Sequence, residues 1–198
     1  MHISSTIIAF AATIGLATAA GAATLPNGGY MVTSDPNGTT IYESLTDSSL
    51  APLVIDESTS LKRSEPTLLE RSAKFARSIL AKRRIDCWGY QLDAAGVDQA
   101  AIYLANACGN GRAVTTEPDR TVRIVGLHNG MMVYYCVNAG GKTGNCDRGD
   151  VSYGLGRMDS QCGRYEASWF GWPGSFEILG KAREGDNVCA GNMNGVPF

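Results

Sequence analysis

Residues 85–110 read IDCWGYQLDAAGVDQAAIYLANACGN, a short apolar run followed by an amphipathic repeat that ends in Cys-Gly. The apolar run at 85–88 predicts a first strand. Four residues then recur at helical spacing: Val97, Ala101, Leu104 and Cys108. Gly109 stands where a glycine commonly closes a helix, so the stretch predicts a helix over 93–107.

A second stretch repeats this design, because Val151, Leu155, Met158 and Cys162 have the same spacing and Gly163 follows. It predicts a helix over 150–161. Strand-like runs at 121–125 and 131–137 flank Asn129-Gly130, which favours a hairpin, and a Gly-rich loop follows at 139–145. Residues 166–179 predict a second hairpin. The order indicates an α+β fold, a small disulfide-stapled α/β sandwich with two short helices on one face of a mainly antiparallel sheet.

All six cysteines lie within the same part of the chain, at Cys87, Cys108, Cys136, Cys146, Cys162 and Cys189. An even number of cysteines behind a secretion signal is typical of a disulfide framework, for which six cysteines allow 15 pairings. The sequence contains no close Cys-x-x-Cys pair of the kind that binds zinc, so we expect no metal site.

The N-terminus predicts secretion. Residues 1–22 have a short apolar core followed by small-x-small cleavage patterns, which is typical of a signal peptide. The core is too short to cross a bilayer, so we expect no stable membrane insertion. The chain has 17 basic and 19 acidic residues, a net charge of -2, which argues against nucleic acid as a partner.

Residues 23–83 are interpreted as a pro-segment. The part 23–66 is rich in Ser, Thr, Asp, Gly and Pro and is expected to be disordered, with a glycosylation sequon at Asn37. Residues 67–80 predict an amphipathic helix that shields the downstream domain, although a basic helix of this kind also suits a membrane surface or a partner groove. Lys82-Arg83 resembles the site of a kexin-type processing protease. Cleavage there would leave a mature domain of 84–198.

The chain offers little catalytic chemistry. The predicted mature domain has one histidine, His128, in the predicted turn, and no nucleophile elbow or phosphate loop is present. We therefore predict no catalytic residue, no cofactor and no enzymatic activity. A small secreted hydrolase or nuclease remains an alternative, in which His128 would pair with one of the carboxylates Glu117, Glu166, Glu177 and Glu184.

An aromatic cluster is the candidate recognition surface. It comprises Trp169, Phe170 and Trp172, the last in a Gly-Trp-Pro-Gly turn. Tryptophan is enriched in binding hot spots, and stacking on sugars would make this a cell-wall or carbohydrate-binding protein. The alternative is that Trp169 and Phe170 fill the core and Trp172 covers the hairpin end.

The pattern resembles the fungal killer-toxin family founded on the killer protein four of a smut fungus, with its related cysteine-rich secreted effectors. The resemblance rests on five features: Ile85-Asp86-Cys87, Ala107-Cys108-Gly109-Asn110, the strand 130–137, the helix between Cys146 and Cys162, and Asp186-Asn187-Val188-Cys189. It implies a disulfide-stapled α/β sandwich without a catalytic centre. It also implies the pairs Cys87–Cys162, Cys108–Cys146 and Cys136–Cys189.

This resemblance implies a secreted fungal effector or killer-toxin-like protein that acts by binding an unknown protein or cell-surface target of a host or competitor. The founder's calcium-channel inhibition depends on surface basic residues and is not carried over, because this sequence has no matching basic motif.

Overall fold

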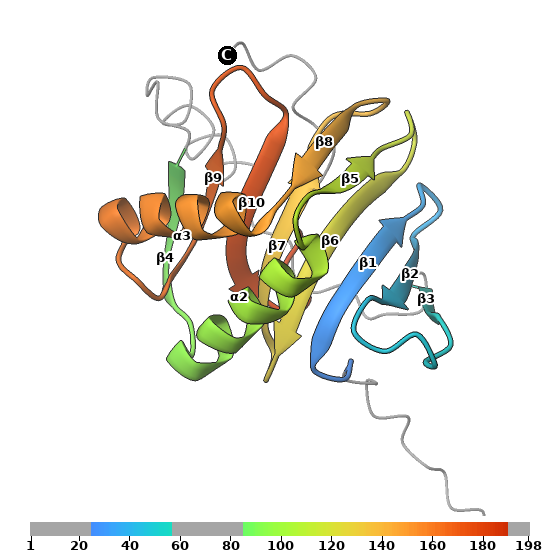
Figure 1. Ribbon diagram of the computed structural model, residues 1–198, viewed down its shortest axis with the longest axis horizontal. Helices are drawn as coiled ribbons and strands as arrows, with labels where there is room; N and C mark the ends of the chain where they lie inside the picture. Colours follow the sequence, from blue (N-terminus) through green and yellow to red (C-terminus); the bar gives the residue numbers. More distant parts are fainter. Residues whose placement is uncertain (1–24, 57–84, 190–198) are drawn as a thin grey trace, which may run out of the picture.

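The computed structural model describes residues 25–56 and 85–189 (Figure 1). An eight-stranded sheet has the order β3-β2-β1-β6-β7-β10-β9-β4, and all its neighbouring strands are antiparallel. Helices α2 and α3 lie on one face of it, which confirms the predicted disulfide-stapled α+β fold. The elements are β1 Gly28–Ser34, β2 Thr39–Ser44, β3 Leu53–Asp56, β4 Ile85–Gln91, α2 Ala94–Cys108, β5 Arg112–Thr115, β6 Thr121–His128, β7 Met131–Val137, β8 Thr143–Cys146, α3 Arg148–Cys162, β9 Glu166–Gly171 and β10 Glu177–Arg183.

Both predicted helices form, and their first turns are capped by aspartates. The Asp93 side chain accepts a hydrogen bond of 2.6 Å from the Gly96 amide at the start of α2. At the start of α3, Asp147 and Asp150 each accept a hydrogen bond from the other's amide, at 2.8 and 3.1 Å. These bonds satisfy amides that have no partner inside the helix. The helix predicted over 150–161 therefore begins two residues earlier, at Arg148.

The predicted hairpins also form. Asn129 and Gly130 between β6 and β7 have φ values of 49° and 73°, the left-handed conformation that a two-residue hairpin turn requires. The predicted Gly-rich loop at 139–145 is partly wrong, because β8 begins inside it and pairs with β5. Neither β5 nor β8 has a clear apolar alternation. Each is stabilised by a partner far away in the sequence.

Residues 25–56 require a correction. They were expected to be disordered, but β1, β2 and β3 pair with one another and β1 pairs with β6 along seven residues. The segment has too few apolar side chains to form a core by itself, and it is ordered because other strands cover them. Tyr30 and Val32 are buried against the downstream strands. The signal peptide 1–22, the helix 67–80 and the dibasic pair Lys82-Arg83 lie outside the described residues.

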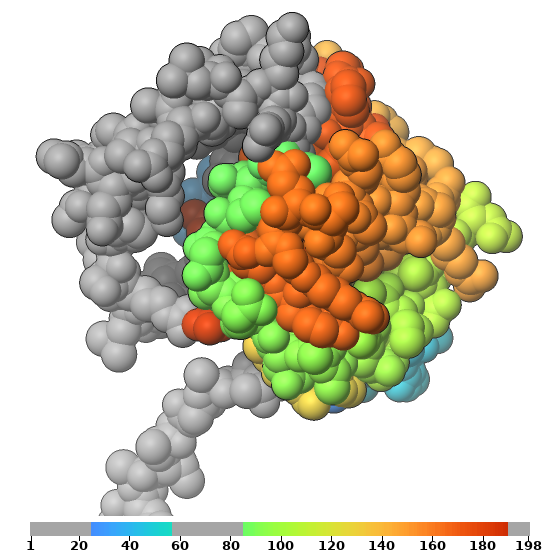
Figure 2. Space-filling model, turned by 90° about the vertical axis from the view of Figure 1, so that its left-hand side faces the viewer, coloured from blue at the N-terminus to red at the C-terminus, as the bar shows by residue number. Residues whose placement is uncertain are grey.

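The helix layer packs closely on the sheet because glycines stand at the contact points. A Cβ on Gly126 of β6 would lie 2.0 Å from the Ala100 carbonyl oxygen of α2. A Cβ on Gly154 of α3 would lie 2.5 Å from a methyl carbon of Leu179. The absence of side chains at these positions allows helix backbone and strand to approach. Figure 2 shows the surfaces of α3 (orange) and of β4 with α2 (green) adjoining on this side of the molecule.

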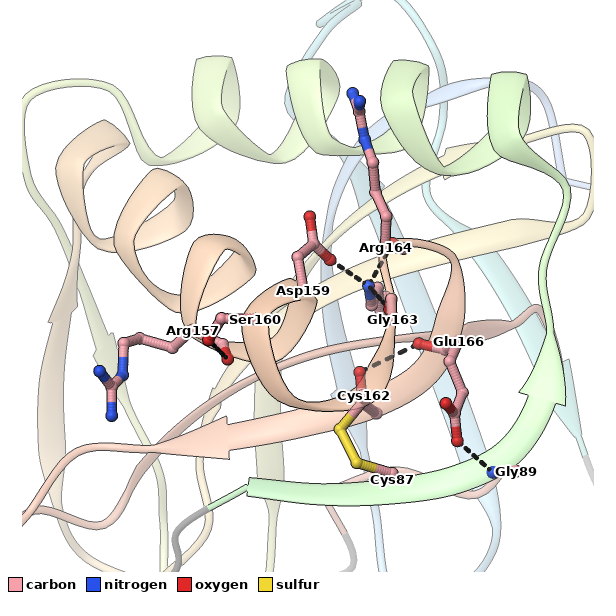
Figure 3. Close-up of a disulfide and its surroundings, with 11 residues drawn as sticks. Cys87, Gly89, Arg157, Asp159, Ser160, Cys162, Gly163, Arg164 and Glu166 are labelled. Carbon is pink, nitrogen blue, oxygen red and sulfur yellow. Dashed lines mark hydrogen bonds and ion pairs between the residues drawn. A yellow bond between two sulfur atoms is a disulfide. The ribbon is translucent and has the colours of Figure 1, made fainter.

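The six cysteines form three disulfides: Cys87–Cys162, Cys108–Cys146 and Cys136–Cys189. These are the pairs that the family resemblance implies. The first joins β4 to the end of α3 (Figure 3), the second joins the end of α2 to β8, and the third joins β7 to the C-terminal stretch 184–189. Each closes a loop of 38 to 75 residues and so restricts the unfolded chain.

Candidate functional site

Strand β6 divides its side chains between the two faces of the sheet. Val122 and Ile124 pack in the core under the helices, and Gly126 lies against α2. Val125 and Leu127 belong to a second apolar cluster on the face opposite the helices, together with Tyr30 and Val32 of β1. This alternation follows from the period of two in a strand. The second face is therefore formed jointly by residues from 25–56 and from 85–189.

A groove of about 540 Å³ lies on this second face. The floor of the groove is formed by the β6 side chains that point away from the helices. The β1–β2 turn and part of β2 form one wall, and the stretch 184–189 forms the other. The lining residues of the groove are Ser34, Asp35, Pro36, Gly38, Thr40, Tyr42, Asp119, Thr121, Arg123, Val125, Leu127, Met132, Glu184, Gly185, Asp186, Asn187, Val188 and Cys189. We call this surface the polar groove.

Arg123 is the cation on the floor of the polar groove. Its Nε is buried and has no hydrogen-bond partner among the described residues. Asp119, Glu184 and Asp186 line the same groove, so its rim is acidic. The half-buried guanidinium of Arg123 is therefore a cation set among carboxylates that line the same groove.

The wall 184–189 is held to the rest of the molecule by hydrogen bonds to Asp186 and by the disulfide of Cys189. The Asp186 carboxylate accepts hydrogen bonds from the Tyr90 hydroxyl at 2.5 Å and from the Arg183 amide at 2.9 Å. The Arg183 guanidinium lies 4.7 Å from the centre of the Tyr90 ring. Cys189 is bound to Cys136 of β7. These contacts fix the wall relative to the sheet.

Tyrosines beside the groove keep their protons at neutral pH. Burial raises the pKa of the Tyr30 hydroxyl, and the charge of Glu184 adds to that shift. Burial raises the pKa of Tyr90 as well, followed by the hydrogen bond to Asp186. Tyr134 is buried among the same apolar side chains, which raises its pKa strongly. These three tyrosines are therefore uncharged at neutral pH.

The three candidate recognition residues do not form one surface. Trp169 packs against the second-face cluster, whereas Phe170 is 4% exposed and belongs to the core under the helices. Trp172 is half-buried on that helix side, with its ring edge-on to Phe170 at 4.9 Å and to Tyr135 at 6.1 Å. Phe170 is thus a core residue and is wrongly placed among recognition residues. The expectation missed this because the neighbouring strand residues Trp169 and Phe170 point to opposite faces, while Trp172 follows the end of β9.

His128 is not joined to a carboxylate. Its Nδ1 is buried without a hydrogen-bond partner in the described structure, and its ring lies 6.0 Å from that of Tyr103. The four candidate carboxylates are elsewhere: Glu117 pairs with Arg120, Glu166 accepts from the Gly89 amide (Figure 3), Glu177 accepts from Tyr135, and Glu184 lines the polar groove. No His–Glu pair suited to acid–base catalysis is present within 25–56 and 85–189.

Glu177 forms a polar junction that the sequence did not reveal. Its carboxylate accepts hydrogen bonds from the Tyr135 hydroxyl, the Asn145 amide at 2.9 Å and the Ser175 hydroxyl at 2.5 Å. Burial by itself would raise the pKa of Glu177, but the hydrogen bonds from Ser175, Tyr135 and Asn145 lower it overall. The nearby Asp150 has a raised pKa, mainly because of burial. With its oxygens engaged by three donors, Glu177 joins β7, β8 and β10 and has a structural role.

Lys181 is a second buried charge that the sequence did not reveal. Its side chain is fully buried, and Nζ donates to the Asp159 carboxylate at 2.5 Å and to the carbonyls of Gly163 and Arg164. Figure 3 shows these acceptors gathered at the C-terminal end of α3, beside the Cys87–Cys162 disulfide. A cation at this end also complements the helix dipole, so Lys181 fixes α3 on the sheet.

Asn37 is exposed in the turn between β1 and β2, and its neighbours Pro36 and Gly38 line the polar groove. Its side-chain oxygen accepts a hydrogen bond of 3.0 Å from the Thr39 amide. In residues 25–56 and 85–189, no helix is long and apolar enough to cross a membrane, and no three His, Cys, Asp or Glu side chains are arranged to hold a metal ion.

Comparison with protein-family models, with curated proteins and with solved structures finds no match to this chain.

Proposed function

We propose that this chain is a secreted effector or killer-toxin-like protein of fungal type that acts by binding a target on host or competitor cells through the polar groove. The observation that carries the proposal is Arg123, a floor cation whose buried Nε has no acceptor among the described residues. An oxygen atom of a bound target would pair with the Arg123 guanidinium where it lines the groove.

The rigidity of the groove supports binding as the mode of action. Its walls come from segments far apart in the sequence, and the Cys136–Cys189 disulfide fixes one of them. A preformed site loses little conformational freedom when it binds, which favours affinity. The acidic rim favours a target segment that carries basic groups and offers a main-chain or side-chain oxygen to Arg123.

The three disulfides support the proposal that the protein is secreted. Disulfides persist in oxidising environments, and a small domain with three of them is typical of secreted proteins. Secretion through the leader 1–22 and cleavage after Arg83 complete the proposal. The family resemblance adds support through its implied disulfide pairs, which coincide with the three pairs above.

The two alternatives have less support. A carbohydrate-binding surface built on Trp169 and Trp172 would need the two rings on one face, but they pack on opposite faces of the sheet. A hydrolase built on His128 would need a carboxylate beside the imidazole. Retention on insoluble chitin or glucan that is lost in Trp172→Ala would revive the first alternative, and turnover lost in His128→Ala would revive the second.

The test compares binding of the labelled protein to host and competitor cells. Arg123→Ala removes the floor cation, and we expect it to lower saturable binding at least tenfold. Arg157→Ala is the matched control, because it removes the same charge from an exposed position on α3. Equal binding by both variants and the unchanged protein would rule out the polar groove as the contact surface. Absence of any saturable binding, together with no effect on cell growth, would rule out the effector function.

A further inference from the structure

We propose that cleavage after Arg83 leaves residues 25–56 bound in the sheet, so that the processed protein is two chains without a covalent link. This inference rests on the processing that is part of the proposed function. The step is hydrolysis of the Arg83–Arg84 peptide bond by a kexin-type protease. It consumes one water and leaves a carboxylate on Arg83 and an amine on Arg84.

The position of β1 in the sheet is the first argument. It lies between β2 and β6, and its register with β6 runs from Gly28 opposite Leu127 to Ser34 opposite Thr121. Departure of residues 25–56 would leave β6 as an unpaired edge along its whole pairing with β1. Such edges attract other chains and are rarely left open. Retention of β1 keeps these main-chain groups paired.

Buried side chains give the second argument. Val32 is 0% exposed and Tyr30 is 4% exposed, and both belong to the second-face cluster with Val125 and Leu127. On the other side of β1, Gly29 lies against α2, where a Cβ would come within 3.1 Å of Ala107. Residues 25–56 are therefore packed into both faces of the structure, unlike a pro-segment laid on a finished surface.

Polar contacts join the same two parts. The Asp35 carboxylate lies 2.6 Å from Nε of Arg120. The side-chain oxygen of Asn27 accepts a hydrogen bond of 3.0 Å from the Asn129 amide. These contacts lie at opposite ends of the β1–β6 pairing, and each adds orientation to the apolar contacts between them.

No covalent bond would join the two chains after cleavage. All six cysteines lie between Cys87 and Cys189, and they pair among themselves. The polar groove nevertheless takes Ser34, Thr40 and Tyr42 from one part and its Arg123 floor from the other. The proposed target site is therefore incomplete without the first chain.

In the test, the purified full-length secreted protein is cleaved with a kexin-type protease. The mass of the product is then measured under native and under denaturing conditions. We expect one native mass that includes residues 25–56, and two separate chains on a non-reducing denaturing gel. A native mass of 84–198 alone would overturn retention. A chain that remains intact after exhaustive digestion would overturn the cleavage on which the proposal depends.

Two variants test the contacts that hold the first chain. Val32→Asp places a charge in the buried contact, and we expect release of the first chain at least tenfold faster after cleavage. Val54→Asp is its control, because Val54 is on β3 and 58% exposed. Arg120→Ala removes the ion pair with Asp35 and an exposed ion pair with Glu117, of which only the first joins the two chains, and it should release the first chain several-fold faster. Equal release from all four proteins would overturn the proposed contact.

Hydrogen exchange gives a readout that does not depend on a variant. We expect the amides of β6 to stay as protected in the cleaved protein as in the intact one, and their full exchange after cleavage would overturn retention. Arg123→Ala should keep the two-chain mass while losing target binding. Loss of the first chain with target binding retained would therefore count against this inference alone, and two-chain assembly without target binding would count against the proposed function alone.

Discussion

Lys181 Nζ lies 2.5 Å from the Asp159 carboxylate, and the lysine side chain has no exposed surface. The pair joins the middle of β10 to the last turn of α3. Breaking a buried pair costs about 3–5 kcal/mol, and hydration of the partly exposed Asp159 reduces this cost. We expect Lys181→Met to lower the free energy of unfolding by about 3 kcal/mol in urea titration. Lys142→Met, at an exposed lysine, should change it by less than about 0.5 kcal/mol. Similar losses in both variants would contradict the role of the pair.

Glu177 should make stability fall in acid. Its pKa in the folded protein is lowered from 4.5, so its contribution is present above that value and disappears as the pH falls through the folded pKa. We expect Glu177→Gln to lower the free energy of unfolding at pH 7 by about 1–3 kcal/mol, because charged hydrogen bonds are lost. Between pH 6 and pH 3 (about 1.5 units on either side of the ordinary carboxyl pKa), the variant should lose less further stability than the unchanged protein. Parallel losses in both proteins would show that other carboxyl groups dominate.

Gly126 should be intolerant of any side chain. Gly126→Ala would bring a Cβ to 2.0 Å from the Ala100 carbonyl oxygen, so α2 would have to move away from β6. Overpacking of this kind costs about 1–3 kcal/mol, and backbone contact on the helix side places the expected loss at the upper end. Gly156→Ala meets nothing within 4 Å in α3 and should stabilise the protein by up to about 1 kcal/mol. Thermal unfolding monitored by circular dichroism should show a lower Tm for Gly126→Ala and a higher Tm for Gly156→Ala than for the unchanged protein.

Of the disulfides, Cys136–Cys189 should be the one that holds a wall of the polar groove in place. Replacing Cys136 and Cys189 with alanine opens a 53-residue separation, and replacing Cys108 and Cys146 opens one of 38, so each should cost about 4 kcal/mol by chain entropy. The first change also frees the wall 184–189 from β7. We therefore expect faster hydrogen exchange at 184–189 and weaker target binding only in the first variant. Equal exchange in the two variants would contradict the wall's dependence on Cys189.

Asn37 should carry a glycan in the secreted protein. The residue is exposed in the β1–β2 turn and the sequon continues through Thr39. We expect Asn37→Gln and Thr39→Ala both to remove a glycosidase-sensitive mass, whereas Asn27→Gln, which lies outside a sequon, keeps it. An unchanged mass in both sequon variants would show that the site is unused.

The sequence predicted the elements whose signals are local. Asp93 and Gly109 mark the ends of α2, and Asn129-Gly130 marks the β6–β7 turn, because caps and turns depend on a few adjacent residues. The strands β1, β5 and β8 could not be predicted in this way. Strands β5 and β8 pair only with each other across the intervening chain, and β1, although it forms a hairpin with β2, is buried against the distant strand β6.

The candidate site was less predictable than the fold. The aromatic residues 169–172 stood out by composition, but strand alternation places them on different faces. No sequence motif marks Arg123. It becomes a candidate binding residue only because β6 lies between β1 and β7, which places it in the groove. An alternation count along 121–127 could have placed Thr121, Arg123, Val125 and Leu127 on one face, although not the walls around them.

The place of β1 in the sheet has a consequence for biosynthesis. Strand β1 is made early, yet its partner β6 starts at Thr121, so the two contact only after the intervening chain has been synthesised. Until then the β1–β2 hairpin has no cover for Tyr30 and Val32, and such long-range pairings form slowly. In the secretory pathway proposed above, the hairpin would therefore expose these apolar side chains to chaperones until residues 85–189 have been synthesised. Conditions that slow the synthesis or folding of residues 85–189 should therefore increase aggregation through the exposed β1–β2 hairpin.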